Sequence, residues 1–136
     1  MASFSTIINT SIEKVWEHLL YKIEYPEAFV SGVSDVLILE KNNEFVVRQM
    51  TITMNDIASK VMEKITFSPY SVRFELLVHP KFTGHVDNGA VFVSENETQL
   101  TYTMNWMDKQ TQIAYENPEI MKNAVLKTKD FIENKP

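Results

Sequence analysis

Apolar residues recur along the chain with two different periods, and the change of period separates helical from extended segments. Between residues 12 and 23 they recur every three or four positions, as on one side of an amphipathic helix. Thr10 and Glu13 have the spacing of a capping box, so we expect this helix to begin directly after Thr10. Tyr25-Pro26 is expected to end it, because the residue before a proline avoids the helical region.

Short polar turns and β-branched or aromatic residues dominate the middle of the chain. Residues 3–9 are expected to form a first strand, and residues 27–31 a short helical piece. Residues 35–107 are typical of an antiparallel meander of six strands. Residues 117–134 carry apolar side chains on one face and predict a long helix, with Pro118 at its first position. The turns of the meander are expected at Asn42-Asn43, Asn55-Asp56, Pro69-Tyr70, 81–83 and 95–97.

The predicted order is therefore strand, helix, six-stranded meander and long helix. Because the helices lie at the two ends of a series of hairpins, the fold class is α+β with a seven-stranded antiparallel sheet. The apolar face of the long helix must lie on that sheet. The chain has 136 residues and neither repeats nor a low-complexity linker, so we expect a single domain over 1–136.

The expected turns fix which side chains share a face of the sheet, because side chains alternate along a strand. A two-residue turn at Asn55-Asp56 places Arg48 directly opposite Glu63. A lone buried charge is costly, so the pairing of these two charges supports the register. The remaining face is mainly apolar, and the residues expected on it include Met50, Phe74, Leu76, Asn88, Phe92, Tyr102, Met104 and Trp106.

The opposite face of the sheet is expected to be polar and hydrated. Asn88-Gly89 is a strong hairpin dipeptide, but a turn there would leave only a stub of strand, so we expect a bulge or a close backbone approach at Gly89. His79 and His85 are expected to face each other across a hairpin beside Asp87; we interpret them as solvated histidines and predict no metal site. The outer face is expected to carry Gln49, Thr51, Lys64, Arg73, Glu75, Thr101 and Thr103.

Composition narrows the classes of partner. Thirteen basic and eighteen acidic side chains give a formal charge of -5, which opposes binding to nucleic acids and anionic lipid surfaces. The chain has no cysteine, which excludes disulfides, a thiol nucleophile and thiolate-held metal centres. We find neither a signal-peptide pattern nor an apolar run long enough to span a bilayer. We therefore expect a cytoplasmic protein with no nucleic-acid partner, no membrane insertion and no cofactor.

Several segments resemble a known superfamily over nearly the whole chain. FSTIINTSIEKVWEHLL is similar to the opening strand and helix, and NPEIMKNAVLKTKDFIEN to the final helix, of the START/birch-pollen-allergen-like helix-grip superfamily, also called SRPBCC. Within it, VVRQMTIT, VMEKITFSPYSVRFEL, HVDNGAVF and LTYTMNW resemble a small bacterial and fungal family of unknown function. One member of that family lies in a fungal secondary-metabolite cluster. The resemblance implies a curved sheet wrapped around the C-terminal helix, with an elongated apolar cavity between them. It implies no particular reaction, because relatives include lipid carriers, polyketide cyclases, quinone-binding proteins and co-chaperones.

The leading functional hypothesis is binding of a small hydrophobic or amphipathic molecule, such as a lipid, polyketide or aromatic metabolite. Small side chains on the inner surfaces predict a cavity of about 300 Å³ or more. The few polar groups would orient the polar end of the ligand, although the charged pair is equally explained as a buried structural ion pair. The candidate ligand-binding residues are Arg48, Glu63, Asn88, Tyr102, Met50, Phe74, Leu76, Phe92, Met104, Trp106, Ala124 and Thr128.

Two other functions remain open from sequence. The same cavity suits a polyketide cyclase or dehydratase, with Glu63, Arg48 and Tyr102 as candidate catalytic groups, although pairing with arginine argues against an acid–base role for Glu63. A protein-interaction or co-chaperone module needs an exposed apolar patch, which the polar outer face does not offer. The sequence specifies neither the ligand nor the oligomeric state, so a homo-oligomer stays open.

Overall fold

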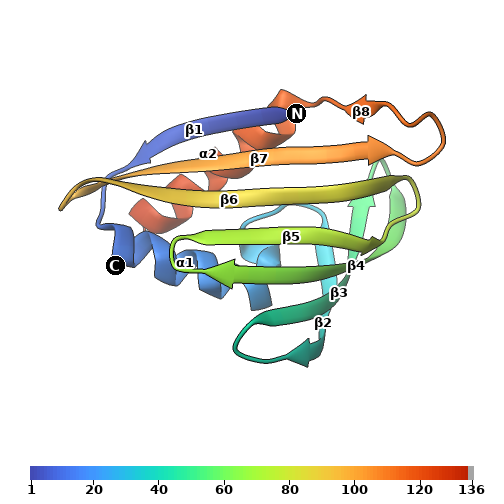
Figure 1. Cartoon of the computed structure of the whole chain (residues 1–136), viewed down its shortest axis with the longest axis horizontal. Coiled ribbons are helices and arrows are strands. Elements are labelled where there is room, and N and C mark those ends of the chain that lie inside the picture. The colour runs from blue at the N-terminus through green and yellow to red at the C-terminus, as the bar shows by residue number, and fades with distance from the viewer. Residues whose placement is uncertain (135–136) are drawn as a thin grey trace.

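The computed structural model describes residues 1–134 and has eight strands in one antiparallel sheet. The strands follow the order β1-β7-β6-β5-β4-β3-β2 across the sheet, and β8 pairs with β7 (Figure 1). The elements are β1 (Ala2–Ile8), α1 (Ile12–Glu24), the 3-10 helix η1 (Pro26–Ala28), β2 (Val33–Lys41), β3 (Phe45–Met54), β4 (Ile57–Ser68), β5 (Ser71–Val78), β6 (Phe82–Ser94), β7 (Glu97–Asp108), β8 (Ala114–Tyr115) and α2 (Pro118–Glu133).

Both helices lie behind the sheet in Figure 1, and they cover its inner face side by side. The long helix α2 packs mainly on β1 and β7, while α1 packs on β6 and β7. The α+β prediction and the helix-grip arrangement are confirmed. The strand count differs by one, because β8 spans only two residues, too few to show an alternating pattern. Neither helix of residues 1–134 has the length and apolar character that crossing a membrane requires.

The first helix begins one residue later than the capping-box pattern predicts. Ser11, not Thr10, is the N-cap, and its hydroxyl oxygen accepts a hydrogen bond from the backbone N–H of Lys14. The predicted end before Pro26 is confirmed, since α1 stops at Glu24. The next helical piece is shorter and earlier than expected: η1 starts at Pro26, which occupies its first turn.

The register of the central hairpins agrees with the prediction. Arg48 is the direct partner of Glu63, across a turn in which Asn55 and Asp56 have φ values of 52° and 65°. Two successive positive φ angles define the type I′ turn, whose twist matches that of the flanking strands. In the same register Met50 pairs with Val61, Ile65 with Phe74, and Asn88 with Tyr102.

Gly89 continues β6, and the prediction of a bulge or a close backbone approach at this residue is wrong. Its register with Ser71 and Thr101 is regular, and a Cβ atom at this position would meet nothing within 4 Å. The close approach occurs at Gly84 instead, where φ is 117° and a Cβ atom would overlap the carbonyl oxygen of Asn105. The backbone therefore requires glycine at Gly84, where a side chain would clash, and not at Gly89.

Candidate ligand-binding site

Three charged side chains are buried between the sheet and the first helix. Among the described residues, Lys22 is 6% exposed, Arg48 3% and Glu63 6%, and no other charged residue is as deeply buried. Lys22 extends from α1, Arg48 from β3 and Glu63 from β4. Burial of three charges inside an apolar face is costly unless each is paired or hydrogen-bonded.

Lys22 lies against two aromatic rings and one amide. Its Nζ donates a hydrogen bond to Oδ1 of Asn88 at 2.7 Å. The same nitrogen lies 4.1 Å from the centroid of the Tyr102 ring and 5.1 Å from that of Phe74, both within cation–π range. Burial, with a smaller contribution from the Arg48 cation, lowers the pKa of Lys22 from 10.5 to about 7, and the Glu63 carboxylate opposes the change. Lys22 therefore changes charge near neutral pH.

Arg48 joins the sheet to the end of α1. Its Nη2 donates to Oε1 of Glu63 at 2.6 Å, and its Nη1 donates to the carbonyl oxygens of Ile23 at 2.7 Å and Lys22 at 3.4 Å. The last carbonyls of a helix have no partner within the helix, and a cation there is favourable. Arg48 therefore has a structural role that the sequence did not indicate, since it caps α1 while pairing with Glu63.

A second polar link connects the sheet to α2. The Tyr102 hydroxyl and Thr128 Oγ1 lie 2.7 Å apart, and Thr128 Oγ1 donates to the carbonyl oxygen of Ala124 at 2.9 Å. Because that carbonyl takes the threonine proton, the Tyr102 hydroxyl donates to Thr128. Burial raises the pKa of Tyr102, so its phenol stays neutral beneath Lys22.

Some buried nitrogen atoms lack hydrogen-bond acceptors. Within residues 1–134, Arg48 Nε, Asn88 Nδ2 and Trp106 Nε1 are closed to solvent and have no partner. All three are N–H donors. Two of them belong to the cluster around Lys22, where Asn88 uses its oxygen for Lys22 and leaves its amide nitrogen free. A buried donor without an acceptor destabilises the fold by about 1 to 3 kcal/mol. An oxygen atom that accepted a hydrogen bond from these donors would therefore stabilise the interior.

The structure brings together most of the residues predicted for the site, and places two of them elsewhere. Phe92 keeps the predicted parity but lies near the end of β6 and is 60% exposed, away from the buried charges. Its role in binding a ligand stays a prediction. Trp106 lies four residues beyond Tyr102 on β7, in an aromatic cluster with Phe82 and Tyr115. The others are buried or half-buried on the inner surfaces: Arg48, Glu63, Asn88, Tyr102, Met50, Phe74, Leu76, Met104, Ala124 and Thr128.

Lys22 is the site residue that the sequence reading missed. It lies three positions after Leu19 and seven after Val15, so helical spacing places it on the same buried stripe as these two residues. This spacing alone indicates a buried position, but a lysine in a helix is usually on the solvated side. Arg48, Glu63 and Asn88 already provided the polar surroundings that allow it to be buried.

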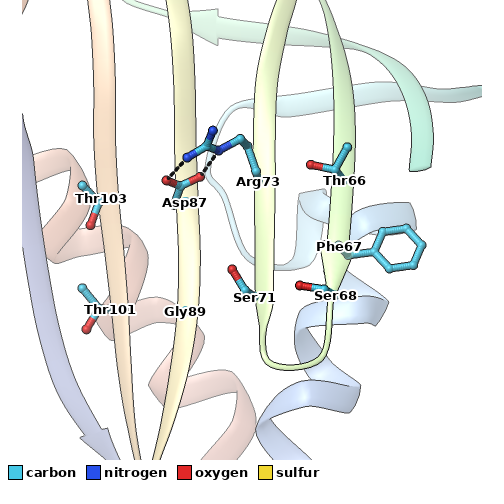
Figure 2. Close-up of a pocket in the computed structure, with 9 residues that line it drawn as sticks. All are labelled: Thr66, Phe67, Ser68, Ser71, Arg73, Asp87, Gly89, Thr101 and Thr103. Atoms are coloured by element: carbon cyan, nitrogen blue, oxygen red, sulfur yellow. Dashed lines mark hydrogen bonds and ion pairs between the residues drawn. The ribbon is translucent and has the colours of Figure 1, made fainter. Parts of the chain in front are cut away.

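Two open grooves lie on the surface that residues 1–134 form, away from the contact of α2 with the sheet. One, of about 570 Å³, lies on the outer face, opposite the helices (Figure 2). Arg73 and Asp87 cross its centre with two hydrogen bonds of 2.8 and 3.0 Å, beside Gly89 and the hydroxyls of Thr101 and Thr103. These two charges neutralise each other in contact with solvent. The outer face also exposes apolar side chains, among them Val91 at 58% and Met107 at 39%.

The second groove, of about 660 Å³, lies beside the first turn of α1. Ile12, Ala90 and Phe92 give it an apolar lining, and the Tyr70 hydroxyl donates to Oε1 of Glu13 at 2.6 Å along its edge. The cavity expected between the C-terminal helix and the sheet therefore stays a prediction.

The two histidines of the outer face do not face each other. On the neighbouring strands, His85 lies opposite Glu75 of β5 and Asn105 of β7. Its Nε2 lies 3.6 Å from Asp87 Oδ2. His79 lies beyond the end of β5, where its Nδ1 accepts the backbone N–H groups of residues 81 and 82. In the described part of the chain no three potential ligands converge on a metal position.

The helix-grip fold and the family match make this chain a member of the START/birch-pollen-allergen-like, or SRPBCC, superfamily. More narrowly, the chain belongs to the family of acetylaranotin biosynthesis cluster protein L, whose model matches residues 7–132. The resemblance to a small family with a member in a secondary-metabolite cluster is thereby confirmed. No curated protein is significantly similar in sequence.

Solved structures with the same fold have little sequence in common with this chain. The Zhui aromatase/cyclase from a Streptomyces species is 16% identical with a TM-score of 0.73, over 97% of this chain and 87% of the other. A START superfamily protein from Mycobacterium smegmatis is 12% identical with a TM-score of 0.71, over 96% and 92% of the two chains. Ara h 8.0201 is 10% identical with a TM-score of 0.69, over 98% and 97%. At these identities the similarity establishes the fold alone.

Proposed function

We propose that the protein binds a small amphipathic molecule between the sheet and the helices, with the polar end of the ligand at Lys22, Arg48 and Asn88. The observation that carries this proposal is the pair of buried N–H donors without acceptors, Arg48 Nε and Asn88 Nδ2, in an otherwise apolar interior. Ligand sites of this kind are mainly apolar and use a few placed polar groups for orientation. The aromatase/cyclases of the same fold support a polyketide-like or aromatic ligand as the apolar part.

Binding at this position requires the helices to move. The cluster is closed to solvent, and neither groove of the surface leads to its orphaned donors. A ligand that binds only the opened conformation shifts the population toward it. The first test is native mass spectrometry of the protein purified from its own host, in which a retained small molecule supports the proposal.

Ala124→Trp is expected to weaken binding of a neutral apolar fluorescent probe at least about tenfold, with little change in stability. Ala124 is half-buried on the inner side of α2, so a large side chain there occupies the proposed ligand volume. Leu126→Trp is the matched control, because Leu126 lies on the same helix and is 38% exposed. Probe titration and denaturant unfolding measure the two effects. A loss of about 1 to 3 kcal/mol in Ala124→Trp, with probe binding unchanged, means that this part of the interior is already filled.

A cyclase reaction is the second candidate function, and Lys22 is the observation that favours it. An amine with a pKa of about 7 is suited to remove an acidic C–H proton between two carbonyl groups. Glu63 is bound to Arg48, and burial raises the pKa of Tyr102, so neither suits this role as well. The wild-type protein is expected to accelerate ring closure of a poly-β-ketone and Lys22→Met to lose the acceleration. Equal rates in both proteins would exclude Lys22 as the base.

A further inference from the structure

We propose that the ligand is an organic acid, and that its proton is held by Lys22 while its anionic oxygen lies between Lys22 and the amide nitrogen of Asn88. The inference rests on the proposed ligand-binding function and specifies the chemical class of the ligand. It follows from the charges and the hydrogen-bond donors of the buried cluster.

The buried charges do not balance when Lys22 is protonated. Lys22 and Arg48 then contribute two positive charges, and Glu63 contributes one negative charge. The Glu63 oxygen is bonded to Arg48, whereas the Lys22 ammonium has only a neutral amide and two ring faces. An uncompensated buried cation is costly, and the lowered pKa of Lys22 agrees with that cost. A single anion beside Lys22 would balance the cluster.

The hydrogen-bonding groups also favour an acidic oxygen. Asn88 Nδ2 and Arg48 Nε are donors that lack acceptors, and Asn88 already holds Lys22 through its oxygen. A carboxylate or enolate oxygen accepts several hydrogen bonds and donates none, which matches this set of donors. An ammonium group on the ligand would meet two like charges, and an alcohol would supply an acceptor without a charge.

The proton balance is simple. The O–H bond of the acid breaks, an N–H bond forms on the neutral Lys22 amine, and the interior gains an ion pair without gaining net charge. The charged or titratable groups that face Lys22 are Arg48 from β3, Glu63 from β4 and Tyr102 from β7. Glu63 is bonded to the Arg48 guanidinium, and the raised pKa of Tyr102 keeps its phenol neutral, so Lys22 takes the proton. An acid that is already ionised in solution above neutral pH must then bind together with one proton from the solvent.

The test is competition against N-phenylnaphthylamine, a neutral fluorescent probe, by decanoic acid and by decanol. At pH 6.5 the acid is expected to displace the probe at least about tenfold more effectively than the alcohol. Above pH 7 the Kd of the acid is expected to rise about tenfold per pH unit, while that of the alcohol stays constant. Calorimetry at pH 8.5 in buffers of different ionisation enthalpy is expected to show uptake of about one proton per acid bound.

Lys22→Met is expected to abolish the preference for the acid over the alcohol and the proton uptake. Lys122→Met is the matched control, because Lys122 is exposed on α2, and it is expected to behave as wild type. Equal binding of acid and alcohol by wild type, no proton uptake, or a preference that survives in Lys22→Met would each overturn the inference and leave ligand binding standing. If probe, acid and alcohol all fail to bind, the proposed function itself is wrong. The proton measurement on wild type decides the question even if Lys22→Met does not fold.

Discussion

Arg48→Met is expected to lower the free energy of unfolding by about 3 to 5 kcal/mol, the range for removing one partner of a buried ion pair. The variant leaves the Glu63 carboxylate buried without its cation and the Ile23 carbonyl oxygen without its donor. Denaturant unfolding at pH 7 measures the loss. A change under about 1 kcal/mol, as for pairs in contact with solvent, would show that water reaches this interior.

Two further variants separate the stability effect of the Arg48–Glu63 ion pair from that of the hydrogen bond between Arg48 and the end of α1. Arg48→Met combined with Glu63→Leu removes both charges, so it is expected to recover the part of the loss that comes from the stranded carboxylate. It does not restore a donor to Ile23, and a residual loss of about 1 to 3 kcal/mol is expected from that carbonyl group. Arg73→Met is the control for an arginine–carboxylate pair on the outer face and is expected to have a far smaller effect. Full recovery in the double variant would show that the bond to α1 contributes nothing.

The stability of the wild-type protein is expected to rise by about 3 kcal/mol between pH 7 and pH 9.5, relative to Lys22→Met. The pKa of Lys22 is about 7 in the folded protein, against 10.5 for an ordinary lysine. In this window the unfolded chain therefore holds one proton more than the folded chain, so raising the pH favours folding. Below pH 7 both states are protonated, and the folded state bears the whole unfavourable effect of the buried charge.

Denaturant unfolding of wild type and Lys22→Met at both pH values gives this difference directly. Other groups that titrate in the same range contribute equally to both proteins and cancel in the comparison. Lys122→Met, with its lysine in solvent, is expected to follow the wild-type curve. Parallel pH dependences in wild type and Lys22→Met would mean that Lys22 keeps an ordinary pKa, and that the inner cluster is hydrated.

The sheet was predictable because its turns are chemically distinct. Asn55-Asp56 sets a two-residue turn, and the alternation of side chains then fixes every partner along two strands, including Arg48 and Glu63. The alternation of side chains fixes the face on which a residue lies. It does not show which part of that strand the helices cover. Phe92 has the correct parity and lies beyond the covered part of β6, which explains why it is exposed.

The parts of the site that sequence reasoning missed depend on contacts between distant elements. Local spacing cannot show that Arg48 reaches the last carbonyl groups of α1, because that contact depends on how the helix lies on the sheet. Lys22 has the spacing of a buried residue but the chemistry of an exposed one, and its partner Asn88 is 66 residues away. Ser11 and Thr10 are both good N-caps, so sequence alone does not choose between them.

The pairing of the first strand has a consequence for how the protein folds during synthesis. β1 lies next to β7, with Ala2 opposite Met104, so the first strand of this sheet to be synthesised pairs with one of the last. Until β7 is made, the apolar residues of β1 and α1, such as Ile8 and Leu19, have no sheet to cover them completely. Contacts between residues so far apart in the chain slow folding, and the nascent chain exposes a surface that aggregates readily. The barrier to folding therefore includes closure of a loop of about one hundred residues, and the nascent protein completes its sheet only after most of the chain has been translated.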